Sequence, residues 1–350
     1  MSIMPKARPN VQRMSGYTPG EQPRPGERVI KLNTNENPFP PSPAVLEAIR
    51  QIDPERLRRY PSPTSEEFRQ TAARVHGVSP DMIVAGNGSD EILAMAVRTY
   101  LGPGDILAYP DPTYSLYPVL AEIGEVKVAT VPWAAGWELP VDALLLTGAA
   151  AIFFANPNAP TGTLVPLARV RELATRFSGL LLVDEAYVDF ADENSVGLVK
   201  EFPNLIVSRT LSKGYGLAGL RFGYAIAAPE VVEEMNKVKD SYNCDAIAIL
   251  AATAALHDQA YARRTWQHVR KERVRLTEAL TRRGWQVIPS QANFVLATCP
   301  DSNAGAIYRA LKSQGILVRF FDKPGLKDKL RITIGTAEEN DQVLAALPAS

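Results

Sequence analysis

The chain has 350 residues, of which 46% are hydrophobic and 22% charged, the composition of a globular protein large enough for two domains. Lys plus Arg and Asp plus Glu both number 38, so the charge balance predicts no general affinity for nucleic acid or for an anionic membrane. The 2 cysteines and 3 histidines have no disulfide-framework or metal-binding spacing. With no secretory signal at the N-terminus and no apolar run of about 18 residues, a cytoplasmic protein is expected.

The first part of the chain is predicted to be extended. Residues 1–28 are rich in Pro, Gly and Arg and lack periodicity, which indicates an N-terminal arm or lid, with a disordered tail as the alternative for residues 1–10. A Ser-Pro pair then predicts a helix that starts at Ala44. A second helix is predicted from Thr64 to His76, with Thr64 as its N-cap.

The middle of the chain alternates short apolar runs with helical stretches, which predicts a mainly parallel α/β sheet with helices on both faces. The runs are Met82–Ala85, Ile106–Tyr109, Val126–Thr130, Ala151–Ala155, Leu180–Val183, Leu205–Ser208 and Tyr224–Ala227. Ligands of such sheets bind at the carboxyl ends of the strands. Four polar residues follow such ends, which predicts a site there: Ser89, Asn158, Asp184 and Lys213.

The last part of the chain predicts a smaller α+β domain. Residues 246–284 are predicted to be helical throughout and to link the domains. Strands are then expected at Trp285–Ile288, Asn293–Ala297, Ile316–Arg319 and Leu330–Ile334, with helices near 303–314 and 337–346. The predicted organisation is an arm (1–28), a large domain (29–245) whose first segment packs with the small domain, and a linking helix with the small domain (246–350).

Lys213 is the most informative single residue. It follows a buried apolar run, and a neighbouring run, Leu180–Val183, leads into Asp184 and Tyr187. An amine placed between two parallel strand ends, with an acid and a phenol from the next strand, fits a covalently held aldehyde cofactor. The alternative is a surface lysine after a strand, which would require the acid and the phenol to be present by chance.

A series of segments in a specific order carries a resemblance over about residues 16–336. They are Gly16–Gly20, Leu32–Pro38, Arg59–Pro61, Gly86–Glu91, Asn156–Gly162, Asp184–Tyr187, Ser212-Lys213, Gly219–Arg221 and Leu330–Thr333. The chain resembles the fold-type I pyridoxal-phosphate (PLP) aminotransferases, and among them the histidinol-phosphate aminotransferase group. The resemblance implies a seven-stranded sheet between helices, whose last strand, Tyr224–Ala227, runs antiparallel.

The resemblance also implies how PLP is held. Lys213 would form the Schiff base, and Asp184 would keep the pyridine nitrogen protonated so that the ring can accept electrons. Tyr187 would donate to the phenolic oxygen and so favour its ionised form. Tyr114 would stack on the ring; for each of these four the alternative is an ordinary structural role.

The cofactor's phosphate requires several donors. The turn Gly88, Ser89 and Asp90 precedes a helix, whose N-terminal amides and dipole favour an anion. Ser212 and Arg221 would add a hydroxyl and a bidentate cation, with Thr210 as a weaker candidate. By resemblance, Tyr60 reaches the phosphate of the neighbouring subunit, which implies a homodimer.

One position departs from the family pattern. The residue before Pro-Thr-Gly, usually an Asn that bonds the phenolic oxygen, is Ala159 here, preceded by Asn158. Either Asn158 takes this role through a shifted backbone, or Tyr187 acts with water.

The substrate site is also assigned by resemblance. Arg331 resembles the arginine that clamps an α-carboxylate, while Arg319 and Tyr17 resemble groups that hold a distal phosphate or carboxylate. Asn37 is a further candidate for this pocket, and a surface arginine on an edge strand is the alternative for Arg319. These groups suit histidinol phosphate as the amino donor and 2-oxoglutarate as the acceptor, which becomes glutamate.

Other functions remain open on the sequence alone. An aromatic amino-acid aminotransferase and a threonine-phosphate decarboxylase would share this scaffold. A PLP-binding regulator would need a DNA-binding domain, which the first 30 or so residues cannot supply. A dinucleotide-binding dehydrogenase would need a Gly-x-Gly-x-x-Gly turn after the first strand, with an acid about 20 residues on, and this pattern is missing.

Overall fold

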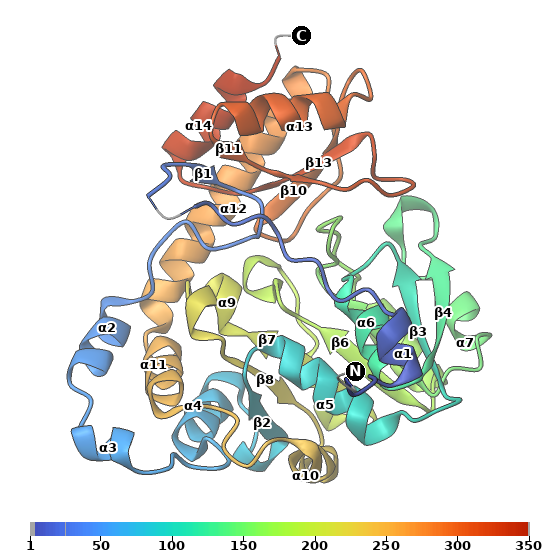
Figure 1. Ribbon diagram of the computed structural model, residues 1–350, viewed down its shortest axis with the longest axis vertical. Helices are drawn as coiled ribbons and strands as arrows, with labels where there is room; N and C mark the ends of the chain where they lie inside the picture. The colour runs from blue at the N-terminus through green and yellow to red at the C-terminus, as the bar shows by residue number, and fades with distance from the viewer. Residues whose placement is uncertain (1–3, 25, 349–350) are drawn as a thin grey trace.

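The computed structural model describes residues 4–24 and 26–348. Its centre is a seven-stranded sheet in the order β2-β8-β7-β6-β5-β3-β4 (Figure 1). The strands are β2 (Ile83–Gly86), β3 (Ile106–Asp111), β4 (Lys127–Pro132), β5 (Ala151–Ala155), β6 (Leu180–Asp184), β7 (Leu205–Thr210) and β8 (Gly223–Ile226). β8 runs antiparallel to β2 and β7, while the other pairs are parallel. The predicted fold class and the antiparallel strand are confirmed.

Helices cover both faces of this sheet, because successive strand residues point to opposite sides. On one side Phe153 and Leu182 pack with α5 (Ser89–Tyr100), α6 (Leu116–Ile123) and α10 (Pro229–Val238). On the other side Phe154 and Leu181 pack with α4 (Glu66–His76), α7 (Val141–Leu145), α8 (Leu167–Arg176) and α11 (Ala246–His257). Both strand faces are apolar, as expected of strands buried on two sides.

A second set of strands lies at the top of Figure 1. Its four-stranded sheet has the order β12-β13-β10-β9 and is antiparallel throughout. The elements are β9 (Gln286–Val287), β10 (Phe294–Thr298), α13 (Ala304–Ser313), β11 (Ile316–Leu317), β12 (Arg319–Phe320), β13 (Lys329–Thr333) and α14 (Ala337–Ala346). β1 (Ile30–Lys31) pairs with β11, and Leu32 belongs to the same apolar core. The first segment therefore packs here; the exact domain boundaries stay a prediction.

The prediction of one helix over residues 246–284 is wrong. The span contains α11 and α12 (Gln259–Arg282), and Asp258 lies between them with a φ of −91° and a ψ of 60°. Its carboxylate accepts a hydrogen bond from the amide of Tyr261 and so caps α12. The other carboxylate oxygen accepts a hydrogen bond from Ser42. Asp258 therefore separates α11 from α12, because its carboxylate caps α12 and is also bonded to Ser42 of a distant segment.

The start of α4 also differs from the prediction. The helix begins at Glu66, and its N-cap is Ser65, in a left-handed conformation with a φ of 53°, and not Thr64. The hydroxyl of Ser62 accepts a hydrogen bond from the amide of Glu66 at 3.2 Å. The cap side chain thus comes from a residue further upstream than the sequence pattern indicated.

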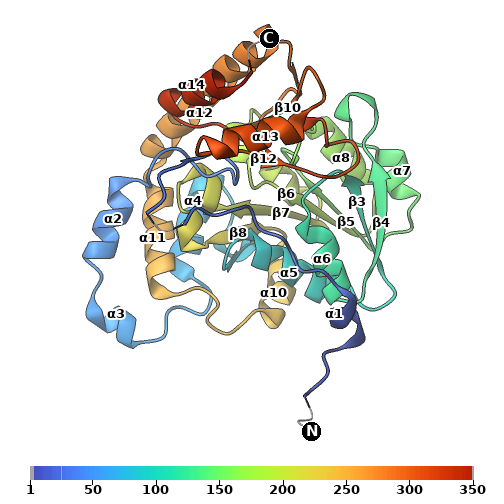
Figure 2. The same ribbon diagram turned by 45° about the horizontal axis from the view of Figure 1, so that its top comes forward.

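The N-terminal arm is better packed than predicted. A short helix, α1 (Pro9–Arg13), lies beside α6, and the Nδ2 of Asn10 donates to the carbonyl oxygen of Glu122 at 3.0 Å. Figure 2 shows the arm passing from α1 across the front of the large sheet toward the small one. The alternative of a disordered tail for residues 1–10 is therefore wrong from Pro9 onward; residues 1–3 lie outside the described part.

The remaining elements are short. They are α2 (Pro43–Arg50), α3 (Pro54–Arg58), α9 (Leu211–Gly214) and the 3₁₀ turns η1 (Pro80–Met82), η2 (Ala135–Trp137), η3 (Val188–Phe190), η4 (Val196–Lys200) and η5 (Ala218–Leu220). Within residues 4–24 and 26–348, no helix has both the length and the apolar character that crossing a membrane requires.

Candidate active site

Lys213 lies on α9, the single helical turn that follows β7. The hydroxyl of Thr210 caps this turn by accepting a hydrogen bond from the amide of Ser212 at 3.2 Å. The side chain of Lys213 is half-buried, and its Nζ donates to the carbonyl oxygen of Thr34 at 2.8 Å. Burial lowers the pKa of Lys213 to about 8, since an amine out of water resists protonation. About a tenth of this amine is therefore an uncharged nucleophile at pH 7, far more than for an ordinary lysine.

The backbone of α9 is held in place by two distant side chains. Asn37 Nδ2 donates to the carbonyl oxygens of Lys213 at 3.2 Å and Gly214 at 3.0 Å. Trp266 of α12 donates from Nε1 to the same Gly214 oxygen at 2.7 Å. The predicted pocket residue Asn37 is thus bonded to the turn that carries Lys213. The contribution of Trp266 was not predicted, because a tryptophan on a long helix looks like an ordinary core residue.

Asp184 ends β6 and is 2% exposed. Its Oδ1 accepts a hydrogen bond from Ser208 at 3.1 Å, and its Oδ2 accepts one from Tyr117 at 3.2 Å. Burial raises the pKa of Asp184 to about 6, and the negative charge of Asp90 adds to the rise. A buried carboxylate with neutral partners on both oxygens is a site that favours an added proton or cation. Ser208 and Tyr117 were not predicted; both lie within apolar runs that indicate core positions.

Tyr187 lies between the Lys213 turn and the small domain. The ring of Phe294 meets it edge to face, with centroids 5.1 Å apart, and the Nζ of Lys213 lies 5.9 Å from its ring centroid. Its hydroxyl accepts a hydrogen bond from Asn35 Nδ2 at 3.0 Å. Burial raises its pKa, an effect that Arg331 and Asn35 oppose. The structure therefore brings together the predicted phenol and amine.

An anion cradle lies at the N-terminus of α5. The guanidinium of Arg221 donates to Ser212 Oγ at 3.2 Å and to Asp90 Oδ2 at 3.3 Å. It lies so close to Gly88 that a β-carbon there would meet Nη2 at 2.5 Å. The free amides of the first turn of α5 and the helix dipole add positive potential. The predicted phosphate-site residues Gly88 and Asp90 thus contact Arg221, which is bonded to Ser212, and Ser89 lies between them as the first residue of α5.

Two further predicted residues are linked to this region through hydroxyl bonds. Tyr114 donates to Asp90 Oδ1 at 3.0 Å. Thr210 donates to Ser212 Oγ at 3.0 Å and so orients the hydroxyl that faces Arg221. Thr210 thus contacts Ser212 of the cradle directly.

Asn158 is fully buried and its amide is already bonded within its own loop. Its Nδ2 donates to the carbonyl oxygen of Pro112 at 3.1 Å and to Thr161 Oγ1 at 2.9 Å, and its Oδ1 accepts from Thr113 at 3.0 Å. The neighbouring Ala159 instead packs in an apolar cluster beside Tyr187. These bonds give Asn158 a scaffold function, and its role toward a cofactor stays a prediction.

The predicted substrate arginines gather around one aromatic ring. Arg331 lies 5.4 Å and Arg319 lies 5.5 Å from the ring centroid of Phe321. Arg331 also donates from Nη2 to the carbonyl oxygen of Asn33 at 3.0 Å, while its buried Nε has no hydrogen-bond partner among the described residues. Tyr17 of the arm lies edge-on to Tyr114 with centroids 6.0 Å apart. An unpaired N–H on a buried guanidinium favours an anionic ligand.

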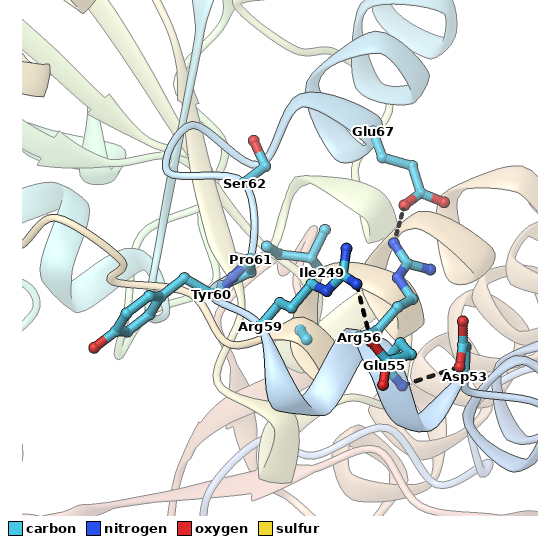
Figure 3. Close-up of a pocket in the computed structure, with 10 residues that line it drawn as sticks. Asp53, Glu55, Arg56, Arg59, Tyr60, Pro61, Ser62, Glu67 and Ile249 are labelled. Carbon is cyan, nitrogen blue, oxygen red and sulfur yellow. Dashed lines mark hydrogen bonds and ion pairs between the residues drawn. The ribbon is translucent and has the colours of Figure 1, made fainter.

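Tyr60 lies away from these groups. It is 81% exposed, and its ring stacks on Tyr242 with centroids 4.5 Å apart. The adjoining surface pocket has a volume of about 340 Å³ and includes Arg59 and Ile249. In Figure 3 the Tyr60 ring points away from the other lining side chains, whereas Arg59 turns toward Glu55. The role of Tyr60 in a neighbouring subunit stays a prediction.

A buried ion-pair group behind α9 was not predicted. Arg209 contacts Glu185 at 2.8 Å and Asp189 at 3.7 Å, and all three side chains are at most 10% exposed. A β-carbon on Gly214 would lie 2.0 Å from Asp189 Oδ2, so this carboxylate packs directly against the turn. Glu185 stands next to Asp184 in sequence, yet as its neighbour on an extended strand end it points to the opposite side.

The chain matches a known protein family over most of its length. The profile for "Aminotransferase class I and II" matches residues 27–347. The chain belongs to this aminotransferase family. The predicted resemblance is therefore confirmed, and the aminotransferase activity of the family agrees with the amine, acid and anion cradle at the strand ends.

Individual aminotransferases of this family match along the whole chain. Histidinol-phosphate aminotransferase 1 of Trichormus variabilis is 48% identical over 97% of this chain and 97% of its own length. Histidinol-phosphate aminotransferase of Syntrophotalea carbinolica is 47% identical over 97% of this chain and 98% of its own. The crystal structure of histidinol-phosphate aminotransferase from Sinorhizobium meliloti, in complex with pyridoxal-5'-phosphate, superposes with a TM-score of 0.91 and 30% identity, covering 99% of this chain and 98% of that one.

Proposed function

We propose that this aminotransferase uses PLP to transfer the amino group between L-histidinol phosphate and 2-oxoglutarate, giving imidazole-acetol phosphate and L-glutamate in histidine biosynthesis. The names and coverage of its relatives support the donor. The observation that carries the chemistry is the pairing of a half-buried Lys213, with a pKa lowered to about 8, and a buried Asp184, with a pKa raised to about 6, in one site. A cytoplasmic location goes with this biosynthetic role.

The side chains of the site fit PLP. The buried Asp184 carboxyl has only neutral donors as hydrogen-bond partners, so it suits a protonated ring nitrogen. Arg221, Ser212 and the first turn of α5 suit a phosphate, since a guanidinium and free amides are strong donors to phosphate oxygens. Tyr114 offers an aromatic face next to this cradle. PLP, when bound, supplies an aldehyde that joins to amines and a ring that accepts the electrons released at the substrate carbon.

Each residue then has a definite task toward the substrate. Lys213 Nζ takes the proton from the substrate Cα as a general base, and a pKa lowered to about 8 makes the uncharged, proton-accepting amine more abundant near neutral pH. Asp184 holds a proton at the ring nitrogen. Tyr187 donates its hydroxyl proton to an anionic oxygen, and the carbonyl of Thr34 accepts a hydrogen bond from the free amine of Lys213.

In this proposal Arg331, Arg319 and the N-terminal arm select the substrate. Histidinol phosphate has a phosphate and no α-carboxylate, whereas 2-oxoglutarate has two carboxylates, so the same cations must accept both kinds of anion. The unpaired Nε of Arg331 and the nearby Arg319 provide such donors. Tyr17, placed beside Tyr114 by the arm, closes this side of the site.

A homodimer is part of the proposal. The exposed Tyr60–Tyr242 pair lies outside the site of its own chain, and Leu57, three residues before Tyr60 in sequence, is 56% exposed. Exposed aromatic and apolar groups of this kind favour a protein interface. A second copy of the chain would bury them and would bring Tyr60 to the phosphate of its partner.

The deciding experiment is a steady-state comparison of amino donors. Histidinol phosphate, phenylalanine and tyrosine are each supplied with 2-oxoglutarate, and glutamate formation is measured. A kcat/KM that is highest for histidinol phosphate is expected. A preference for phenylalanine or tyrosine would instead identify an aromatic aminotransferase, and CO₂ release from threonine phosphate would identify a decarboxylase.

A further inference from the structure

The hydroxyl group of Tyr187 has one polar neighbour in a mostly apolar setting. Ala159, Ala292 and Phe294 form the cluster against which its ring packs. Among the residues that the structure describes, the hydrogen bond from Asn35 Nδ2, at 3.0 Å, is the one that this hydroxyl makes. The direction in which Tyr187 can donate therefore depends on how the Asn35 amide is oriented.

The orientation of the Asn35 amide is set by Thr333. The backbone N–H of Asn35 donates to Thr333 Oγ1 at 3.1 Å. The proton of the Thr333 hydroxyl must then point elsewhere, and Asn35 Oδ1 accepts it at 3.0 Å. Because Oδ1 is bonded to Thr333, the NH₂ group of Asn35 has to face Tyr187.

The backbone of Asn35 is also held firmly. The residue is 1% exposed, and its carbonyl oxygen accepts a hydrogen bond from Asn293 Nδ2 at 2.9 Å. Its φ of 59° lies in the left-handed region, which asparagine tolerates better than most residues. The amide thus approaches Tyr187 from a fixed backbone.

A tyrosine hydroxyl has one proton and two lone pairs. Since Asn35 donates into one lone pair, the proton of Tyr187 has to point away from Asn35. We infer that Asn35 is a positioning residue that keeps the Tyr187 proton free to be donated to the phenolic oxygen of the cofactor. The inference rests on the proposed function, because it is toward this oxygen that the proton would be donated.

Several charged groups near Tyr187 also influence its hydroxyl, independently of Asn35. Arg331 of β13, Asp184 of β6 and Lys213 of α9 face it, together with Tyr17 of the arm. All of them remain in place when Asn35 alone is changed. A hydrogen bond to the ionised oxygen lowers the pKa of the Lys213–cofactor linkage, so loss of that bond should raise it.

The test uses Asn35→Gly, because glycine accepts the positive φ and keeps the backbone bonds to Thr333 and Asn293. The full-length protein is loaded with PLP, and the violet absorbance band is titrated between about pH 5 and pH 10. The midpoint should rise by about half a unit to one unit, the effect of one neutral hydrogen bond. An unchanged midpoint would overturn the inference.

A double-mutant cycle separates a positioning role from a structural one. Tyr187→Phe should raise the midpoint by itself, and Asn35→Gly should add no further shift in that background, because Asn35 acts through the hydroxyl. Additive shifts would overturn the inference. Thr333→Val, which removes the hydroxyl that orients the amide, should shift the midpoint in the same direction even if the glycine variant folds poorly.

Asn33→Ala is the matched control. Asn33 is also buried, at 2% exposure, but its Nδ2 donates to the carbonyl oxygen of Glu21 and not to Tyr187. It should reduce the thermal stability of the cofactor-free protein and leave the midpoint unchanged; a shift equal to that of Asn35→Gly would count against the inference. If the unsubstituted protein forms no violet band with PLP, the proposed function and the inference fail together. A normal band with an unchanged Asn35→Gly midpoint removes the inference alone.

Discussion

Arg221 Nη2 occupies the space that a side chain on Gly88 would need, since a β-carbon there would lie 2.5 Å from it. Gly88 also has a φ of 82°, which other residues rarely adopt. We therefore expect Gly88→Ala to displace the guanidinium and weaken PLP binding about ten- to a hundredfold, the effect of losing charge-assisted hydrogen bonds. Absorbance titration of the cofactor-free protein with PLP measures this.

Gly219→Ala is the control for that change. Gly219 lies close to Arg221 in sequence, but a β-carbon there would have nothing within 4 Å. Its affinity for PLP should stay within about twofold of the unsubstituted protein, as for most surface changes. Equal affinity of both variants would show that Arg221 does not hold the phosphate.

The depressed pKa of Lys213 predicts how fast the protein takes up PLP. Only the uncharged amine attacks an aldehyde, and burial lowers its pKa from 10.5 to about 8. The rate of band formation in cofactor-free protein should therefore rise with pH and level off above a midpoint near 8. Stopped-flow absorbance across this range is the measurement. A midpoint near the ordinary value of 10.5 would mean that the amine is not desolvated.

Lys213→Ala should abolish transamination while the protein still folds. Within the described part of the chain the side chain makes one hydrogen bond, to the carbonyl of Thr34, and its removal from a half-buried position disturbs little packing. The circular dichroism spectrum should match that of the unsubstituted protein, and the free energy of unfolding in urea at pH 7 should be no lower, because burying this amine costs free energy. Multiple turnovers by this variant would remove Lys213 from the mechanism.

Asp184 should destabilise the cofactor-free protein near neutral pH. Its folded pKa, about 6, lies above the ordinary 3.8, so the folded state binds a proton more tightly than the unfolded state. The free energy of unfolding therefore falls as pH rises through about 6. The loss amounts to about 3 kcal/mol between about pH 3 and pH 7. Asp184→Asn, which cannot ionise, should be more stable than the unsubstituted protein at pH 7 by an amount of this order, measured by urea unfolding.

The difference between the two proteins isolates Asp184, because Glu185 and Asp189, whose pKa values are also raised by burial, are present in both. Turnover of Asp184→Asn should fall about 100-fold or more, the scale of a lost charge partner at a reacting centre. Parallel pH profiles of stability for the two proteins would contradict the raised pKa.

The proposed position of Tyr60 in the partner's site predicts that two inactive variants restore activity when they form mixed dimers. If it reaches the partner's site, Tyr60→Ala and Lys213→Ala each damage a site that is built from both subunits. Mixed dimers then contain one intact site, so an equimolar mixture should recover up to about a quarter of the normal activity after subunit exchange. Activity of the mixture before and after exchange is compared. No recovery, although hybrids form, would place Tyr60 outside the partner's site.

Much of the site could be predicted from local patterns. Apolar runs indicated the strands, and a parallel sheet brings the carboxyl ends of its strands to one edge. Asp184 ends β6 and Lys213 follows β7, and these two strands pair directly, so both residues lie at adjacent strand ends. The sequence order of Gly88, Ser89 and α5 likewise indicated an anion site, because the amides at a helix start are free wherever the helix is placed.

Tertiary structure alone decided which distant groups meet these residues. Asn35 and Tyr187 lie 152 positions apart, and Tyr117 reaches Asp184 over 67 positions. The break at Asp258 depends partly on Ser42, 216 positions away. The hydrophobic periodicity of a sequence indicates which face of a helix or strand is buried. It does not indicate which side chain of another helix or strand packs against that face. Hydrogen-bond partners are set by the packing of whole helices and sheets, and this packing minimises the free energy of the entire chain and not of any single segment.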